Sequence, residues 1–328
     1  NWNGEEDSRV CLGALKSQSV APAIIVVDNG SSDNFSEFVK QSHKDVVLLE
    51  NSKNLGFAGG ANTGIRYAMK NGFDYVALIN NDATPTKTWL EELLKSASAD
   101  VKTGITTGKL LKTDGTIDST GDQYTTWGLP YPRGRNTADN GQYDTAEQVF
   151  AGSGGASLYS IQMLKQIGLF DEDFFAYYED VDVSFRAQLA GWKVMYEPKA
   201  VAHHKIGASS GRVQGFTNYQ TVKNLPWLMW KNVPLGLFPK ILPRFFISYN
   251  AIVFSSLAKG KFAPVFKGLF MTALLLPKKL IQRYKIQKSK TVSTSYIGKM
   301  LTHDLPPNAY KLKKVQSFFN SLAFWNRS

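Results

Sequence analysis

The front of the chain alternates short apolar runs with amphipathic segments. Each apolar run is rich in β-branched or aliphatic residues and stops at polar turn residues, a pattern typical of buried strands. The strands predicted in this way are residues 23–27, 46–49 and 75–79. The segments that follow them predict helices at residues 34–41, 61–70 and 89–97. Strands that alternate with helices favour a mainly parallel sheet covered by helices on both faces.

Beyond residue 104 the pattern changes to short β-like pieces and a loop rich in glycine, proline and asparagine at 128–141. The later elements predicted are a strand near 149–159, a helix at 181–190 and a strand at 193–196. After residue 215 the sequence is helical in pattern and basic. We therefore divide the chain into an α/β part, residues 1–215, and a basic helical part, residues 216–328.

Composition narrows the class of protein. Of the 328 residues, 43% are hydrophobic and 20% are charged, which is globular composition and excludes wholesale disorder. A single cysteine, Cys11, excludes a disulfide framework and a cysteine-based zinc site. Lysine, arginine and proline interrupt the longest apolar stretches, so none is an unbroken apolar run of the roughly 18 residues that a membrane-spanning helix needs.

The net charge of +11 is distributed unevenly. Residues 221–328 contain 18 Lys and Arg against one acid, Asp304, which gives +17. The first 220 residues hold the remaining 20 bases and 26 acids, which gives −6. The basic part suits an anionic partner, either nucleic acid or an acidic membrane surface. The acidic part suits a metal or catalytic carboxylates.

Polar side chains follow two of the predicted strands at the edge where α/β sheets bind ligands. Asp28 and Asn29 follow the strand predicted at 23–27, and Asn80, Asn81 and Asp82 follow the strand predicted at 75–79. A carboxylate there can hold a divalent cation beside the phosphates of a ligand, because hard cations prefer oxygen ligands. Either aspartate alone is more simply explained as a cap of a turn or helix, but the two together at two strand ends favour a site.

A glycine-rich segment at 51–64 runs into the second predicted helix. Its amides could bind phosphate or ribose at the helix N-terminus. It matches neither the P-loop pattern nor the dinucleotide-binding fingerprint, and close packing between helix and strand explains its glycines equally well.

Carboxylates and aromatic residues are interleaved at 170–186. Aromatic surroundings desolvate a carboxylate and raise its affinity for a proton, which suits a general base. Glu179 and Asp180 open the predicted helix there, where acidic residues are also common for reasons of stability alone. His203 ends a β-like stretch and is either a structural residue or a further metal ligand.

In their order along the chain, several of these segments resemble the family 2 glycosyltransferases, which have the GT-A fold. The bacterial rhamnosyltransferase-like members are the most similar. The segments that carry the resemblance are residues 1–4, 27–33, 54–64, 79–82, 152–156 and 170–186, extended by His203 and residues 209–211. The match covers roughly residues 1–231. It implies a nucleotide-binding, mixed and mainly parallel sheet flanked by helices. In that fold residues 1–4 end the first strand, most of which we expect to precede residue 1.

The resemblance implies a role for each matching position. In the nucleotide-sugar site, Trp2 is expected to stack on the nucleobase and Asp28 and Asn29 to read its edge. The side chains expected near the nucleotide and its diphosphate are Asn54, Asn62, Asn80 and Asn81.

The same resemblance implies the catalytic and metal-binding residues. Asp82 ends a DxD-like element and is expected to hold Mg²⁺ or Mn²⁺, with His203 as a second ligand. Asp180, paired with Glu179, matches the catalytic base. Gly154 and Gly155 are expected to line the acceptor site.

The activity implied is an inverting transfer from a nucleotide-sugar donor to a glycan or polyprenyl-linked acceptor in bacterial surface polysaccharide synthesis. L-rhamnose from dTDP-rhamnose is the expected sugar, and UDP-galactofuranose and UDP-N-acetylhexosamine are the alternatives. A sugar-nucleotide pyrophosphorylase is disfavoured, since no basic glycine-rich loop follows the first strand. A non-catalytic relative stays open. The acidic front and apolar tail argue against a nucleic-acid-binding protein.

The segment 262–282 places apolar residues at near-helical spacing and runs into a cluster of lysines and arginine. That composition is typical of an anchor on an anionic membrane surface, and predicts a cytoplasmic protein held peripherally on the inner face of the plasma membrane. The alternative is a helical subdomain that packs on the catalytic domain or on a second subunit of a homo-oligomer.

Overall fold

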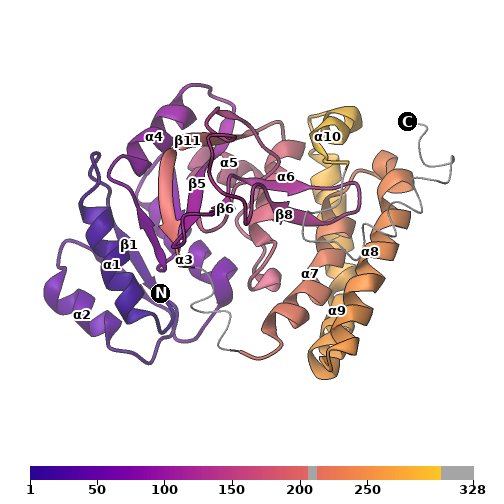
Figure 1. Ribbon diagram of the computed structural model, residues 1–328, viewed down its shortest axis with the longest axis horizontal. Helices are drawn as coiled ribbons and strands as arrows, with labels where there is room; N and C mark the ends of the chain where they lie inside the picture. Colours follow the sequence, from indigo (N-terminus) through magenta and orange to yellow (C-terminus); the bar gives the residue numbers. More distant parts are fainter. Residues whose placement is uncertain (206–212, 304–328) are drawn as a thin grey trace.

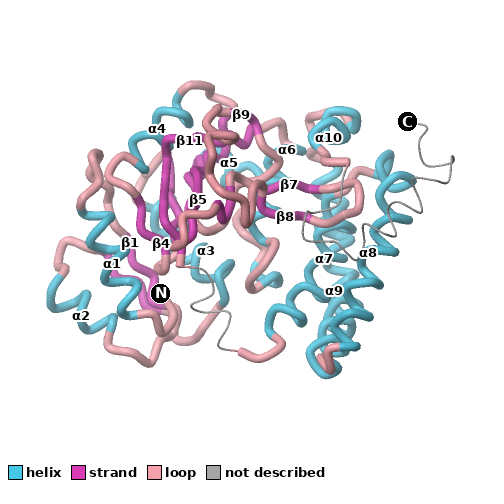
Figure 2. Tube along the Cα trace, viewed as in Figure 1, coloured by secondary structure: helices cyan, strands magenta, loops and turns pink. Residues whose placement is uncertain are grey.

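The computed structural model describes residues 1–205 and 213–303 (Figure 1). A sheet with helices on both faces forms one side of the molecule, and the C-terminal helices form the other (Figure 2). Residues 209–211, which extend the family resemblance, lie outside the described residues, as does Asp304.

The predicted elements of the α/β part appear in their predicted order. The helices are α1 (Glu5–Lys16), α2 (Phe35–Ser42), α3 (Gly56–Lys70), α4 (Trp89–Ser98), α5 (Ile161–Ile167) and α6 (Glu179–Leu189). Of these, α1 and α5 are helices that the sequence did not predict. The longer strands are β1 (Ile25–Asp28), β2 (Val47–Glu50), β3 (Tyr75–Ile79), β5 (Thr103–Lys112), β10 (Ala156–Ser160) and β11 (Lys193–His204). The shorter strands are β4 (Ala83–Pro85), β6 (Ile117–Ser119), β7 (Asp122–Tyr124), β8 (Pro130–Pro132) and β9 (Glu147–Gln148).

The central sheet is mixed and has the strand order β3-β10-β5-β11-β4, with β6 paired to β5 and β9 to β11. Strands β5 and β11 are parallel, whereas β10 is antiparallel to β3 and β5, and β4 is antiparallel to β11. Strands β3, β5 and β11 therefore run in one direction. Strands β1 and β2 form a separate parallel pair. The predicted α/β class, with a mixed sheet flanked by helices, is confirmed.

Successive side chains of each strand point to opposite faces of the sheet and pack in two separate cores. On one face of the sheet, Trp89 and Leu93 of α4 pack with Leu158 of β10 and with Tyr75 and Ala77 of β3. On the other face, helices α3, α5 and α6 cover Val76 of β3, Ile105 of β5 and Val194 of β11. Adjacent residues of β3 thus enter opposite cores, as the period of a strand requires.

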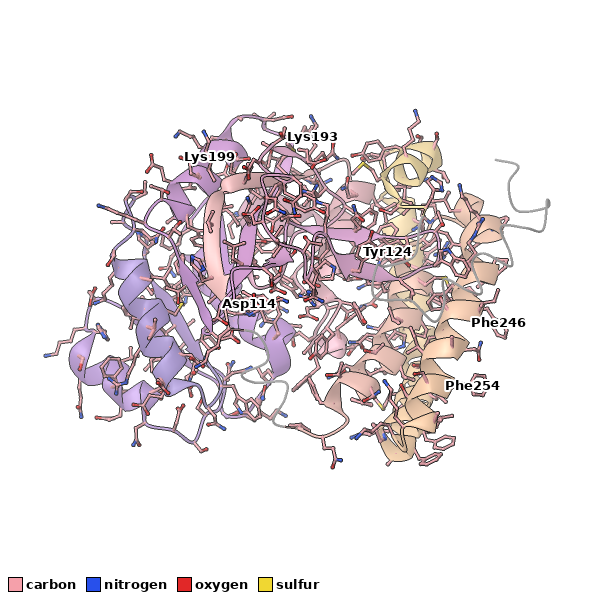
Figure 3. All side chains as sticks on the ribbon, viewed as in Figure 1. Asp114, Tyr124, Lys193, Lys199, Phe246 and Phe254 are labelled. Carbon is pink, nitrogen blue, oxygen red and sulfur yellow. The ribbon has the colours of Figure 1, made fainter. Side chains whose placement is uncertain are left out.

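The C-terminal helices are α7 (Phe216–Asn232), α8 (Phe238–Ala258), α9 (Phe262–Lys288) and α10 (Thr294–Met300). A third core joins them to the α/β part, because Phe185 of α6 and the fully buried Tyr124 of β7 pack with Trp227 of α7 and Ile241 of α8 (Figure 3). The C-terminal helices therefore pack on the α/β part. This packing is the alternative to a membrane anchor for residues 262–282.

Candidate active site

A cavity of about 1370 Å³ opens beside the carboxyl ends of β1 and β3. Its apolar part lies between these two strands, and its polar part gathers acidic residues from distant parts of the chain. The charged and imidazole side chains of the polar part are Asp82, Asp118, Asp122, Arg135, Glu179, Asp180 and His204. The two carboxylates expected to share one cleft, Asp82 and Asp180, thus line the same cavity.

Asp180 lies at the start of α6 and is fixed by backbone amides. Its Oδ2 atom accepts a hydrogen bond from the amide of Gly154 at 2.8 Å, and its Oδ1 atom accepts one from the amide of Val181 at 2.8 Å. Burial raises the pKa of Asp180, although these backbone hydrogen bonds oppose the shift. The carboxylate therefore has a fixed orientation and an increased affinity for a proton.

Glu179 is buried beside Asp180, with 5% of its surface exposed. No described residue offers a hydrogen bond to its Oε2 atom. Burial, followed by the negative charge of Asp180, raises the pKa of Glu179 well above its ordinary value of 4.5. The pair thus combines one hydrogen-bonded carboxylate with one that the fold leaves partly unsatisfied.

Asp122 is a third carboxylate of this cluster, and no sequence pattern indicates it. It accepts a hydrogen bond from the Ser119 hydroxyl at 3.1 Å. Burial and then the charge of Asp180 raise the pKa of Asp122 to about 7. Asp122 lies among the short β-like pieces after residue 104, where no periodic pattern or motif marks it.

The segment before Asp180 has an unusual backbone. Phe175, Tyr177 and Tyr178 have φ angles of 65°, 69° and 72°, a left-handed conformation that bulky residues rarely adopt. The side-chain amide of Asn224 in α7 donates hydrogen bonds to the carbonyls of Phe174, Ala176 and Tyr177 at 2.9–3.0 Å. Helix α7 therefore holds the turn that presents Asp180, a role that the sequence did not indicate.

The glycine-rich segment forms the first turn of α3, which begins at Gly56 and not at the predicted residue 61. Gly56 has a φ of 72°, and a Cβ atom there would lie 2.3 Å from the carbonyl oxygen of Phe175. A Cβ on Gly60 would lie 3.1 Å from the side-chain amide nitrogen of Asn29. Close packing against neighbouring segments therefore accounts for these two glycines, as one of the two interpretations predicted, and both also line the cavity.

The asparagines expected near the nucleotide divide into two groups. Asn29 and Asn54 line the cavity and hydrogen-bond to each other at 3.2 Å. The Asn29 amide also bonds Gly56 and two further groups of the glycine-rich segment, so it supports that segment. Asn62 does not line the cavity, because its amide bonds the backbone of Phe170 and the carboxylate of Glu172. Asn62, expected near the nucleotide, instead holds the segment at Phe170 and Glu172 beside α3.

Most of the remaining residues expected in the site line the cavity: Trp2, Asn80, Asn81, Gly154 and Gly155. Asp28 is the exception, because it accepts hydrogen bonds from the Asn1 side chain and the Ser31 amide and stabilises the turn after β1. The backbone of Asn1 pairs with β1, donating to Val27 at 2.7 Å and accepting from Asn29 at 2.8 Å. This pairing places Trp2 at the edge of the cavity.

The histidine beside Asp82 is His204, and the choice of His203 is corrected. The Nε2 atom of His204 lies 3.1 Å from Oδ1 of Asp82, whereas the His203 side chain is exposed. Adjacent residues of β11 point to opposite faces, so only one of the two can enter the site. The parity of this strand depends on its pairing with β5, which a single sequence does not reveal.

Asp118 and Arg135 extend this group. The Nδ1 atom of His204 lies 2.8 Å from Oδ2 of Asp118, and an Nη2 atom of Arg135 lies 2.7 Å from Oδ1 of the same carboxylate. Burial alone would lower the pKa of His204, but its hydrogen bonds with Asp118 and Asp82 outweigh burial and raise the pKa to about 9. The imidazole is therefore held between two carboxylates.

The side chains at this site can bind a divalent cation only if a bound ligand or water supplies further coordinating atoms. Among residues 1–205 and 213–303, no group of three or more His, Cys, Asp and Glu side chains is arranged to hold a metal ion. Asp82 and His204 together offer one carboxylate and one imidazole. Mg²⁺ and Mn²⁺ accept such ligands and commonly complete their coordination with substrate phosphates and water.

Replacement of Glu179 by glutamine is expected to stabilise the protein at alkaline pH. A carboxyl group with a raised folded-state pKa holds its proton where the unfolded chain releases it, so its contribution to stability falls as pH rises above 4.5 toward the folded pKa. The variant should gain at least about 1 kcal/mol over wild type near pH 8 and little near pH 5. Urea unfolding of the variant and wild type at both pH values measures the difference in stability. An equal difference at the two pH values would contradict the raised pKa of Glu179.

Comparisons with known proteins agree with this geometry. The sequence profile of the family described as "Glycosyl transferase family 2" matches residues 2–168, just over half of the chain. Low-salt glycan biosynthesis hexosyltransferase Agl10 of Haloferax volcanii is 27% identical over 190 residues, 57% of this chain and 59% of that protein. N-acetylglucosaminyl-diphospho-decaprenol L-rhamnosyltransferase of Mycobacterium tuberculosis is 28% identical over 211 residues, 58% of this chain and 68% of that protein.

A solved structure shares the fold. Mannosyltransferase PcManGT from Pyrobaculum calidifontis, in complex with GDP-Man and Mn²⁺, aligns with 88% of this chain and 83% of its own at a TM-score of 0.52 and 16% identity. This likeness places the sheet and its helices in the GT-A class.

Proposed function

The chain belongs to glycosyltransferase family 2, and we propose that it catalyses the inverting transfer of a sugar from a nucleotide-sugar donor. The proposed sugar is L-rhamnose from dTDP-rhamnose, and the proposed acceptor is a glycan or a polyprenyl-linked saccharide. The observation that carries the proposal is that Asp82 and Asp180 line one cavity at the carboxyl ends of the strands. The first could act on the diphosphate and the second on the acceptor.

The chemistry requires a base and a means to stabilise the leaving group. In the proposed step, the acceptor oxygen forms a bond to the anomeric carbon while the bond from that carbon to the diphosphate oxygen breaks, and the electron pair leaves with the diphosphate. Asp180 accepts the hydroxyl proton. A single displacement of this kind inverts the configuration. Its raised pKa favours Asp180 as the acceptor of that proton.

Asp82 and His204 would hold the divalent cation, and Asp118 would orient the imidazole through Nδ1. When bound there, Mg²⁺ or Mn²⁺ neutralises negative charge on the departing diphosphate. Asn80 replaces the first carboxylate of the DxD-like element, and its amide nitrogen lies 3.4 Å from Nε2 of His204. Arg135 lines the same part of the cavity and adds a positive charge near the proposed position of the diphosphate.

The identity of the sugar rests on similarity. The relative named as an L-rhamnosyltransferase is 28% identical, and the chain spans 59% of one curated relative and 68% of the other. The donors UDP-galactofuranose and UDP-N-acetylhexosamine are the alternatives, because a shared fold does not fix the donor. The enzyme is proposed to act at the cytoplasmic face of the membrane, where a lipid-linked acceptor would be presented.

A donor screen tests the proposal, with the two neighbouring histidines as matched variants. The purified protein is given dTDP-rhamnose, UDP-sugars or GDP-sugars with Mg²⁺ or Mn²⁺ and a polyprenyl-linked acceptor, and nucleoside diphosphate release is measured. We expect release with dTDP-rhamnose. His204→Ala should raise the Mn²⁺ concentration needed for half-maximal rate by about 10–100-fold, while His203→Ala leaves it unchanged. No release with any donor, or equal effects of the two variants, would refute the assignment.

A further inference from the structure

Helices α8 and α9 carry most of the large apolar side chains that the described residues expose. Eleven of the sixteen large apolar residues that the described chain exposes lie between Leu235 and Tyr284. We name six of them the phenylalanine face, and each is more than half exposed: Phe246, Phe254, Phe262, Phe266, Phe270 and Leu274. Soluble proteins rarely leave so large an apolar group uncovered, and a patch of this kind is typical of an interaction site.

The face belongs to two helices that touch each other. Residues 262, 266, 270 and 274 are spaced four apart and form one stripe along α9. Phe246 and Phe254 of α8 project from the side of the molecule away from the sheet (Figure 3). Between the helices, Val253 of α8 and Val265 of α9 pack with Val222 of α7. The two exposed stripes therefore lie on neighbouring elements.

Charge indicates what covers the face. Residues 216–303 contain no aspartate and no glutamate. Exposed lysines accompany the apolar stripes: Lys259, Lys267, Lys285 and Lys288. A second copy of this face would bring like charges together, whereas an anionic lipid surface accepts both the phenylalanines and the lysines.

Helix α8 can contact lipid while it stays packed on the rest of the protein. The segment Leu235–Ala258 is long and apolar enough to cross a membrane, with a mean hydropathy of 1.3. Its inner side, however, is part of the protein core, where Phe245 and Ile241 are buried and the Ser248 hydroxyl donates to the carbonyl of Trp127 at 3.0 Å. Spanning would expose this inner side, whereas lying along the surface keeps it packed.

The same contacts connect α8 to the wall of the cavity. A Cβ atom on Gly128 would lie 2.5 Å from the ring of Phe245, so the turn between β7 and β8 sits directly on α8. Asp122 of β7 and Tyr131 of β8 line the cavity. Helix α8 and the β7–β8 hairpin therefore separate a surface bound to the phenylalanine face from the candidate active site.

We propose that the phenylalanine face docks the protein flat on an anionic bilayer, with helix α8 and the β7–β8 hairpin between the lipid and the cavity. Docking in this way would present a lipid-linked acceptor to Asp180, and that part of the inference rests on the proposed function. The docking itself depends only on the surface of α8 and α9.

Vesicle binding tests the docking with variants on exposed positions. The full chain is sedimented with vesicles of phosphatidylcholine, alone or mixed with phosphatidylglycerol. Wild type should bind the mixed vesicles more strongly. Phe246→Gln/Phe254→Gln and Phe266→Gln/Phe270→Gln should each lower binding at least about ten-fold, because each removes two phenylalanines that lipid would bury. Val10→Gln/Val101→Gln is the matched control, since these residues are exposed elsewhere, on α1 and after α4.

Other results would overturn the docking. Both phenylalanine variants could bind the mixed vesicles as strongly as wild type, or the control variant could lose as much binding as they do. Wild type could also bind both kinds of vesicle equally. A wild-type dimer in lipid-free solution that the phenylalanine variants dissociate would assign the face to a second copy. Nucleoside diphosphate release by hydrolysis of the donor, measured without lipid, should be unchanged in these variants. Its absence in wild type would therefore count against the proposed function and not against docking.

Discussion

Asp180→Asn is expected to lower kcat by about 10³-fold and to leave the Michaelis constant for the donor nearly unchanged. Asparagine keeps the size of the side chain, and its carbonyl oxygen can still accept a hydrogen bond from the amide of Gly154. It cannot take the proton of the acceptor hydroxyl. The loss therefore falls on the chemical step, and steady-state measurement of nucleoside diphosphate release separates kcat from binding.

Asp114→Asn is the matched control for this prediction, because Asp114 is an exposed aspartate in a turn outside the cavity lining. It should keep wild-type turnover. Both variants should unfold at temperatures close to or above that of wild type, since Asp180→Asn removes a buried charge that burial disfavours. Turnover by Asp180→Asn within a few-fold of wild type would assign the base to another carboxylate, and Asp122 and Glu179 would be the next to replace.

The elements of the α/β part could be predicted because their signals are local. Strand β3 was predicted with its observed bounds, since an apolar run between a glycine-containing turn and Asn80 leaves little choice of register. Helix α3 was predicted to begin five residues too late, because glycines usually disfavour helix. The contact between Gly56 and Phe175 decides that boundary, and the two residues are far apart in the sequence.

The carboxylates of the candidate site were predicted where an acidic residue follows a strand or opens a helix. Asp82, Glu179 and Asp180 meet that condition, and all three line the cavity. Asp118 and Asp122 do not, because they lie on short irregular strands that reach the site through long-range pairing with β5 and with Ala151. The choice between His203 and His204 failed for a similar reason, since the pairing of β11 with β5 determines it.

The contrast of charge between the two parts of the chain suggested an external partner. The structure shows that part of it is satisfied inside the protein. Lys231 of α7 lies 2.7 Å from Asp171 and 2.9 Å from Asp182, and Lys279 of α9 lies 2.7 Å from Asp171 and from Asp173. Both lysines are buried. These ion pairs join the basic helices to the acidic segment that leads into α6.

Lys231→Met should therefore strongly destabilise the protein, although Lys231 is not part of the cavity lining. Methionine keeps the aliphatic chain but removes the ammonium group from between Asp171 and Asp182. Loss of one partner of a buried ion pair costs about 3–5 kcal/mol, because the other charge remains buried. Lys279 and Arg186 still compensate these carboxylates in part, so we expect a loss of about 3 kcal/mol in the free energy of unfolding.

Lys278→Met provides the control, because Lys278 of α9 pairs with Asp173 but its side chain is 55% exposed. An exposed pair contributes about 0–1 kcal/mol, so this variant should unfold at nearly the wild-type denaturant concentration. Lys231→Met should also lower kcat, because the segment that it stabilises includes the strained turn before Asp180. Equal unfolding of the two variants would mean that Lys231 does not hold α7 to the catalytic segment. The positioning of Asp180 would then depend on the other contacts of α7 with that segment, among them those of Asn224 and Lys223.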